Sequence, residues 1–227
     1  MSEFDLYNVL LILVILIVPI IAQASVKSNY NKYAKVKNSM GMTGYDVAKK
    51  ILEMNGLSYV KVNKTYGELT DHYNPKTKMV NLSEAIYEDK SISAMAVAAH
   101  ECGHAIQDKE AYSFLKFRSA MVPTVNFTSK FASIFVLLGF IFSFGSLITI
   151  GIVLMLASLL FQIITLPVEF NASNRAKKQL QQLGFIQGND KTGINKVLKA
   201  AAFTYVASFL ATAAQILRLF LISRNRR

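Results

Sequence analysis

The most restrictive feature of this sequence is an apolar stretch over residues 127–167 in which Lys130 is the only charged residue. At about 1.5 Å per residue, one helix of that length would measure roughly 60 Å, about twice the hydrocarbon thickness of a bilayer. A single membrane-crossing helix is therefore excluded. Because Phe-Gly-Ser at 144–146 offers a turn near the middle, the sequence predicts a transmembrane helical hairpin over 124–167.

Two further apolar segments are long enough to cross a membrane. Residues 6–24 predict an N-terminal transmembrane anchor over 1–25. A cleaved signal peptide is the alternative, but acidic residues and no Lys or Arg precede the apolar run. The C-terminal segment, 201–227, contains an apolar helix at about 201–222 and a basic tail. That helix either spans, with its small hydroxyl side chains facing other helices, or lies on the membrane surface.

Charge gives the expected orientation and partners. The formal net charge is +11, from 25 Lys and Arg against 14 Asp and Glu. Lysines follow the first apolar segment and arginine and lysines follow the hairpin, which places the chain from residue 26 onward in the cytoplasm. The tail residues Arg224, Arg226 and Arg227 conflict with this topology if the last helix spans. No aromatic-rich binding motif accompanies the basic residues, so we expect a lipid bilayer as partner and no nucleic acid.

One segment, 26–123, has the patterning of a soluble domain, and a second cytoplasmic segment, 168–200, is expected after the hairpin. The hydrophobic periodicity and the turn signals predict a short series of helices and strands in the first. These are helices over about 43–56 and 91–109 and strands over 57–62 and 78–82. The expected fold is α+β, with a small sheet beside the second helix, combined with three to four transmembrane helices.

The second predicted helix contains His100-Glu101-Cys102-Gly103-His104, an HExxH pattern. Residues four apart lie on one face of a helix, so both imidazoles can bind one zinc ion. The Glu101 carboxylate would lie beside the zinc, where it can take a proton from a zinc-bound water and later deliver it to the leaving amine. Two of the three histidines in the chain fall in this pattern, which raises its weight above that of a chance match.

A catalytic zinc site needs a third protein ligand. Glu169, in the cytoplasmic segment 168–200, is the best candidate, because an acid so close to an apolar span is costly unless it is paired or bound to a metal. His72 and Glu110 are alternatives. His72 is also a candidate for stabilising the oxyanion of the tetrahedral intermediate, although a histidine that merely occupies a turn explains its position equally well.

Three stretches resemble a known family: DHYNP at 71–75, VAAHECGHAIQ at 97–107 and LPVEFNAS at 166–173. They are similar to the YugP-type membrane zinc metallopeptidases of bacteria, over nearly the whole chain. That family resembles the gluzincins, including the HtpX-like membrane proteases. The resemblance implies a zincin-like peptidase fold with His100, His104 and Glu169 as zinc ligands.

The resemblance also implies that Glu101 is the catalytic base. HtpX-like enzymes carry an aspartate four residues after the ligand glutamate, whereas this chain has Ser173 there. The group that orients a ligand histidine is therefore unassigned, with Asn171 as a candidate.

Together these features predict a multi-pass protein of the cell membrane with a cytoplasmic, zinc-dependent endopeptidase domain that binds one Zn²⁺ per chain. Its substrates would be peptides or membrane proteins at the cytoplasmic membrane face. We expect residues 78–82 to form an edge strand that holds the extended substrate by main-chain hydrogen bonds. The alternative function is a non-catalytic membrane scaffold that binds partners and retains a structural zinc site.

Overall fold

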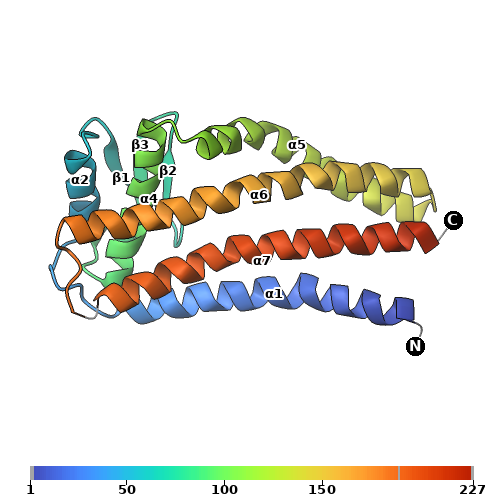
Figure 1. Cartoon of the computed structure of the whole chain (residues 1–227), viewed down its shortest axis with the longest axis horizontal. Helices are drawn as coiled ribbons and strands as arrows, with labels where there is room; N and C mark the ends of the chain where they lie inside the picture. Colours follow the sequence, from blue (N-terminus) through green and yellow to red (C-terminus); the bar gives the residue numbers. More distant parts are fainter. Residues whose placement is uncertain (1–2, 189, 226–227) are drawn as a thin grey trace. The chain divides into compact units, whose positions relative to one another are not determined.

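The computed structural model describes residues 3–188 and 190–225, so Arg226 and Arg227 of the basic tail lie outside the described residues. The described chain is mostly helical with one three-stranded sheet (Figure 1). In chain order the elements are α1 (Glu3–Ala34), α2 (Gly44–Met54), β1 (Lys61–Thr65), β2 (His72–Asn74), β3 (Met79–Ser83), α3 (Glu84–Glu88), α4 (Ile92–Lys109), α5 (Ser113–Ile141), α6 (Gly145–Gln182) and α7 (Asp190–Asn225).

These elements form two compact units, and each of the four long helices contributes most of its length to unit 1 and an end to unit 2. Unit 1 comprises Met1–Gln23, Lys116–Leu166 and Phe203–Arg227. Unit 2 comprises Ala24–Leu115 and Pro167–Ala202. Most of the predicted soluble domain at 26–123 and the whole of 168–200 fall in unit 2.

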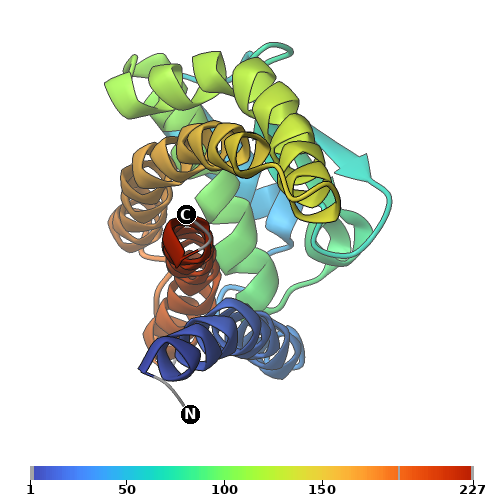
Figure 2. The ribbon, with the colours of Figure 1, turned by 90° about the vertical axis from the view of Figure 1, so that its right-hand side faces the viewer.

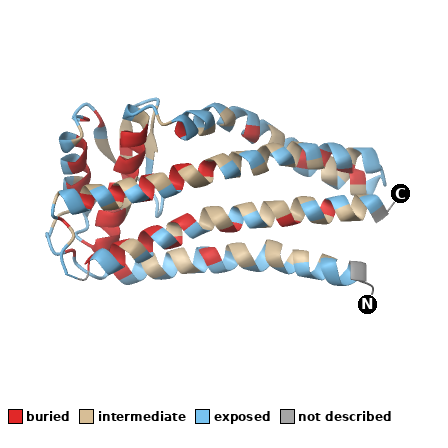
Figure 3. Ribbon diagram, viewed as in Figure 1, coloured by how far each residue is buried: buried red, intermediate tan, exposed pale blue. Residues whose placement is uncertain are grey.

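Unit 1 contains the apolar parts of α1, α5, α6 and α7, and each of these helices is long and apolar enough to cross a membrane. In Figure 2 the yellow-green α5 and the orange α6 lie side by side. The turn that joins them lies at 142–144 rather than at the predicted 144–146, because Gly145 already begins α6. Many apolar side chains on these helices are exposed (Figure 3), as contact with lipid requires.

Side-chain hydrogen bonds join three helices of unit 1. The Ser129 and Ser158 hydroxyls lie 2.9 Å apart between α5 and α6. The Gln162 amide on α6 donates to the Thr212 hydroxyl on α7 at 3.0 Å. The small hydroxyl residues of α7 therefore face a neighbouring helix at Thr212, which is the arrangement expected of a packed helix in a bundle.

Unit 2 is built around α4. Every residue from 92 to 107 is buried except Val97 and His100, which are half-buried, and Figure 3 shows this helix almost entirely in the buried colour. Its many alanines have short side chains, so neighbouring elements can approach it closely. The helices α2 and α3 and the sheet contact it, and Gln107 hydrogen-bonds to α6. The two helices carrying the site are thus held in one hydrophobic core.

The predicted helix over 43–56 is confirmed as α2. The Thr43 side chain accepts a hydrogen bond from the Asp46 N–H, and the Asp46 carboxylate accepts one from the Thr43 N–H, which is a capping box. At the other end Gly56 adopts φ +64°, and the Leu57 N–H donates to the Leu52 carbonyl at 2.8 Å. This helix-ending turn uses Leu57, so β1 begins at Lys61 instead of the predicted residue 57.

The sheet has the order β1-β3-β2, with β1 parallel and β2 antiparallel to β3. The prediction that residues 78–82 form an edge strand is wrong, because β3 pairs on both sides. Its Val80 and Leu82 side chains, two residues apart, are buried on the same face of the sheet. The strand β2, which the sequence did not reveal, is the edge that contacts α4.

Candidate metal centre

The helix α4 brings His100 and His104 onto one face. They are one helical turn apart, and their rings meet edge to face with centroids 4.8 Å apart. The Nε2 atoms of both rings lie toward the same carboxylate oxygen, Glu169 Oε2, at 3.2 Å from His100 and 3.6 Å from His104. Two imidazole nitrogens and one carboxylate therefore converge on one point.

Glu169 reaches this point because α6 packs very closely against α4. On α6 the residues Val168, Glu169, Ala172 and Ser173 are buried on one helical face. Gly103 lies between the two histidines, and a Cβ at that position would be 2.5 Å from the Ala172 carbonyl oxygen. Only glycine leaves room for this approach. Gly103 thus determines how closely Glu169, the acidic member of the group, approaches the two histidines.

Glu101 is buried next to these three residues, on α4. Its carboxylate accepts a hydrogen bond from the Tyr73 backbone N–H of β2. Burial raises the pKa of Glu101 to about 7, against an ordinary value of 4.5. The neighbouring His100 lowers this pKa, and the Glu169 carboxylate raises it further. A carboxyl group whose pKa lies near neutrality can both accept and release a proton at physiological pH.

This pKa predicts a pH-dependent stability of the metal-free protein. Since folding raises the pKa of Glu101, the folded state prefers the protonated carboxyl. The stabilisation is complete below about pH 4.5 and is lost as the pH rises to about 7. The difference amounts to about 3 kcal/mol. We therefore expect the thermal unfolding midpoint of the wild type to fall relative to that of Glu101→Gln as the pH rises from about 4.5 to about 7. Both proteins are measured in detergent with a chelator present.

The matched control is Glu110→Gln. Glu110 lies at the end of α4, and its hydrogen bond with Arg175 holds the pKa of this exposed carboxyl below its usual range. The stabilisation from Glu110 is therefore present above its ordinary pKa and lost as the pH falls, which is the opposite sign. A wild-type midpoint that follows that of Glu101→Gln at every pH would show that Glu101 ionises without cost in the folded protein.

The strand β2 is held against the sheet and α4 at two points. The half-buried Asp71 carboxylate accepts hydrogen bonds from the Ser83 N–H at 2.7 Å and from the Ser83 hydroxyl at 3.0 Å. The Tyr73 hydroxyl donates to Asp108 Oδ2 on α4 at 2.7 Å. These two contacts fix the position of the Tyr73 N–H that Glu101 uses.

The remaining ring nitrogen of each histidine also has a partner. The Nδ1 atom of His100 lies 3.2 Å from the hydroxyl of Ser173, the residue at the position of the aspartate of HtpX-like enzymes. The Nδ1 atom of His104 lies 3.0 Å from Gln107 Oε1. Sequence reasoning missed Gln107. Its signal was its spacing, because a residue three positions after His104 lies on the same helical face as both histidines.

The other candidates named from the sequence lie elsewhere. His72 is exposed on β2, with Nδ1 2.8 Å from the Thr70 carbonyl oxygen and Nε2 3.2 Å from the Asn81 amide nitrogen. Glu110 pairs with Arg175 at 2.7 Å. Neither belongs to the convergent group of His100, His104 and Glu169 in the described part of the chain. The oxyanion role of His72 stays a prediction. Asn171 contacts Gln107 and Arg175.

The chemistry of the convergent group fits zinc. Its three donor atoms, two imidazole nitrogens and one carboxylate oxygen, all lie within 4.8 Å of one another. Two histidines and one glutamate are a donor set that zinc takes in hydrolytic sites, with a further position left for water or substrate. Each imidazole also has a polar partner on its other nitrogen, as metal-binding histidines almost always do.

Comparisons with known proteins point the same way. A family described as "Putative neutral zinc metallopeptidase" matches residues 8–224. The chain is 49% identical over 206 residues to the "Putative membrane protease YugP" of Bacillus subtilis (strain 168), which covers 91% of this chain and 92% of that protein. No solved structure matches the chain. The match therefore extends over all four apolar helices as well as the histidine and glutamate positions.

Proposed function

We propose that this chain, which belongs to the family described as "Putative neutral zinc metallopeptidase", is a zinc-dependent endopeptidase of the HExxH gluzincin type. His100, His104 and Glu169 would hold one zinc ion, and Glu101 would be the catalytic base. The zincin-like arrangement of the peptidase domain belongs to this proposal.

One observation carries the proposal: three zinc-type donor atoms converge within 4.8 Å, and the buried Glu101 carboxyl lies beside them. A zinc ion bound there would supply Lewis-acid chemistry, lowering the pKa of a water and polarising a carbonyl group. A structural zinc site would need no buried carboxyl group next to its ligands. The presence of Glu101 therefore favours hydrolysis over a scaffold role.

The residues of the chain divide the work as follows. Glu101 accepts a proton from the attacking water and later delivers it to the departing amine. The Tyr73 N–H holds the carboxylate in position for both transfers. The buried surroundings of Glu101 keep bulk water from competing for the proton.

The substrate would be an extended polypeptide that lies along β2. This strand is the sheet edge next to α4, and the Tyr73 N–H on it is directed at Glu101. An extended chain can add to such an edge through main-chain hydrogen bonds. The edge role that the sequence assigned to 78–82 thus passes to residues 72–74.

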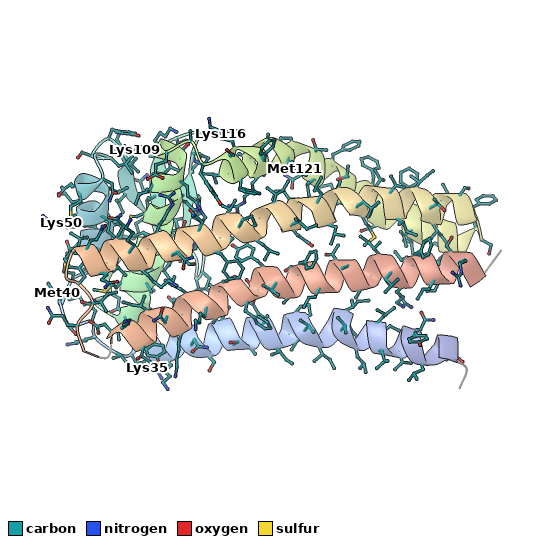
Figure 4. The ribbon with its side chains drawn as sticks, in the orientation of Figure 1. Lys35, Met40, Lys50, Lys109, Lys116 and Met121 are labelled. Carbon is teal, nitrogen blue, oxygen red and sulfur yellow. The ribbon has the colours of Figure 1, made fainter. Side chains whose placement is uncertain are left out.

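We further propose that the substrates are membrane-associated proteins. The helix α6 carries the apolar segment up to Leu166 and, three residues later, Glu169. A peptide bond positioned at Glu169 would then be close to the end of a membrane-crossing segment. Exposed lysines on unit 2, among them Lys35, Lys50 and Lys109 in Figure 4, suit the cytoplasmic face of a multi-pass membrane protein.

The test uses the full chain in oriented membrane vesicles with a mixture of quenched fluorescent peptides. Inside-out vesicles should cleave peptides, a chelator should stop cleavage and added zinc should restore it, whereas sealed right-side-out vesicles should be inactive. Vesicles with Glu101→Gln should bind zinc normally and lose roughly 10²- to 10⁴-fold in rate.

Each other outcome contradicts one part of the proposal. Zinc binding without cleavage of any peptide would favour the alternative function, a membrane scaffold with a structural zinc site. Cleavage by right-side-out vesicles would reverse the orientation, and full activity in Glu101→Gln would remove Glu101 as the base.

A further inference from the structure

Gln107 joins the two helices that carry the candidate metal centre. It lies one turn after His104 on α4, and its side chain is fully buried. Its amide nitrogen donates to the Val168 carbonyl oxygen at 2.8 Å and to Asn171 Oδ1 at 2.9 Å, both on α6. Its amide oxygen faces His104 Nδ1 at 3.0 Å. One side chain therefore contacts a histidine of the site and the residue directly before Glu169.

The direction of each hydrogen bond around Gln107 is fixed by chemistry. The Val168 carbonyl can only accept, so the Gln107 amide nitrogen must face it. The Arg175 guanidinium can only donate, and its Nε lies 2.7 Å from Asn171 Oδ1. Asn171 therefore presents its oxygen to Gln107, which again requires the Gln107 nitrogen on that side.

These constraints leave the Gln107 oxygen for His104. An amide oxygen only accepts, so His104 must carry its proton on Nδ1. In the neutral ring Nε2 then keeps its lone pair, and this is the atom that lies 3.6 Å from the Glu169 carboxylate. The ring of His100 lacks this constraint, because its Nδ1 faces the Ser173 hydroxyl, which can either donate or accept.

We propose that Gln107 is a positioning residue: it holds His104 in the Nδ1–H tautomer, with Nε2 ready to bind a metal, and fixes the part of α6 that presents Glu169. The inference deepens the proposed zinc peptidase function and rests on it. Arg175 supports this hydrogen-bond network at the protein surface. It orients Asn171 by a hydrogen bond and pairs with Glu110.

The test reads the tautomer directly in metal-free protein. The chain has only three histidines, so ¹⁵N-histidine labelling and NMR of the full chain in detergent resolve each ring. At a pH at which the ring is neutral, the wild-type His104 should be in the Nδ1–H form. Gln107→Met keeps the length of the side chain but removes the amide, and should give a mixture of tautomers at His104. A wild-type His104 in the Nε2–H form would overturn the proposal without any variant.

The matched control is Gln179→Met. Gln179 lies on α6 and accepts a hydrogen bond from the Asn55 amide at 2.8 Å, away from the histidines. It should leave the His104 tautomer unchanged. In chelator competition, zinc affinity should fall about 10- to 100-fold in Gln107→Met and stay at the wild-type value in Gln179→Met. Equal zinc affinity in both variants would contradict the positioning role.

The two proposals can fail separately. A tautomer change in Gln107→Met together with no zinc binding by the wild type would uphold the role of Gln107 at His104 and refute the zinc peptidase. Normal zinc-dependent cleavage by the wild type with an unchanged tautomer in Gln107→Met would uphold the zinc peptidase and refute the role of Gln107.

Discussion

Gly103→Ala is expected to abolish zinc binding while the protein still folds. The added Cβ would lie 2.5 Å from the Ala172 carbonyl oxygen and 3.1 Å from its carbonyl carbon. Both are backbone atoms of α6, so no side-chain rotation relieves the clash, and α6 has to move away from α4. Glu169, less than one helical turn before Ala172, moves with it and leaves the two histidines.

The energies explain why zinc binding should suffer more than folding. Overpacking costs about 1–3 kcal/mol, and Ala in place of Gly in a helix returns about 1 kcal/mol. The net change in the free energy of unfolding is therefore small. Loss of a ligand should exceed the roughly 10- to 100-fold drop in metal affinity typical of changes around a site. Zinc affinity and the thermal midpoint, measured on the same sample, separate the two effects.

Gly145→Ala is the matched control, because a Cβ at that position meets no atom within 4 Å. It should leave zinc affinity unchanged. Wild-type zinc affinity in Gly103→Ala would show that the close approach of α6 to α4 does not determine the geometry of the site.

Local signals predicted the parts of the fold that depend on neighbouring residues. The capping box of Thr43 and Asp46 and the turn at Gly56 define α2 because all of their contacts lie within one helix. The HExxH pattern likewise needs only the period of a helix to bring His100 and His104 together.

The parts that the sequence did not predict depend on contacts between distant segments. The strand β2 has only three residues, and its position depends on the Asp71–Ser83 and Tyr73–Asp108 hydrogen bonds. For the same reason the central place of β3 could not be read from its own pattern, which is equally compatible with an edge.

Glu169 is an intermediate case. Its position after an apolar span marked it as costly, and the family resemblance pointed to a ligand, but neither explains how it reaches α4. The structure supplies that explanation through Gly103 and Gln107, whose partners on α6 are more than sixty positions away. Gln107, the partner of His104, was missed because the sequence alone does not show which groups a buried glutamine contacts.

The most direct test of the site is the zinc content of detergent-purified wild type beside Glu169→Ala and Glu110→Ala. A mononuclear site predicts about one zinc per chain in the wild type. Glu169→Ala should lose it, and Glu110→Ala should retain it because Glu110 pairs with Arg175 outside the convergent group. Full zinc content in Glu169→Ala, or no zinc in the wild type after reconstitution, would contradict the site of His100, His104 and Glu169.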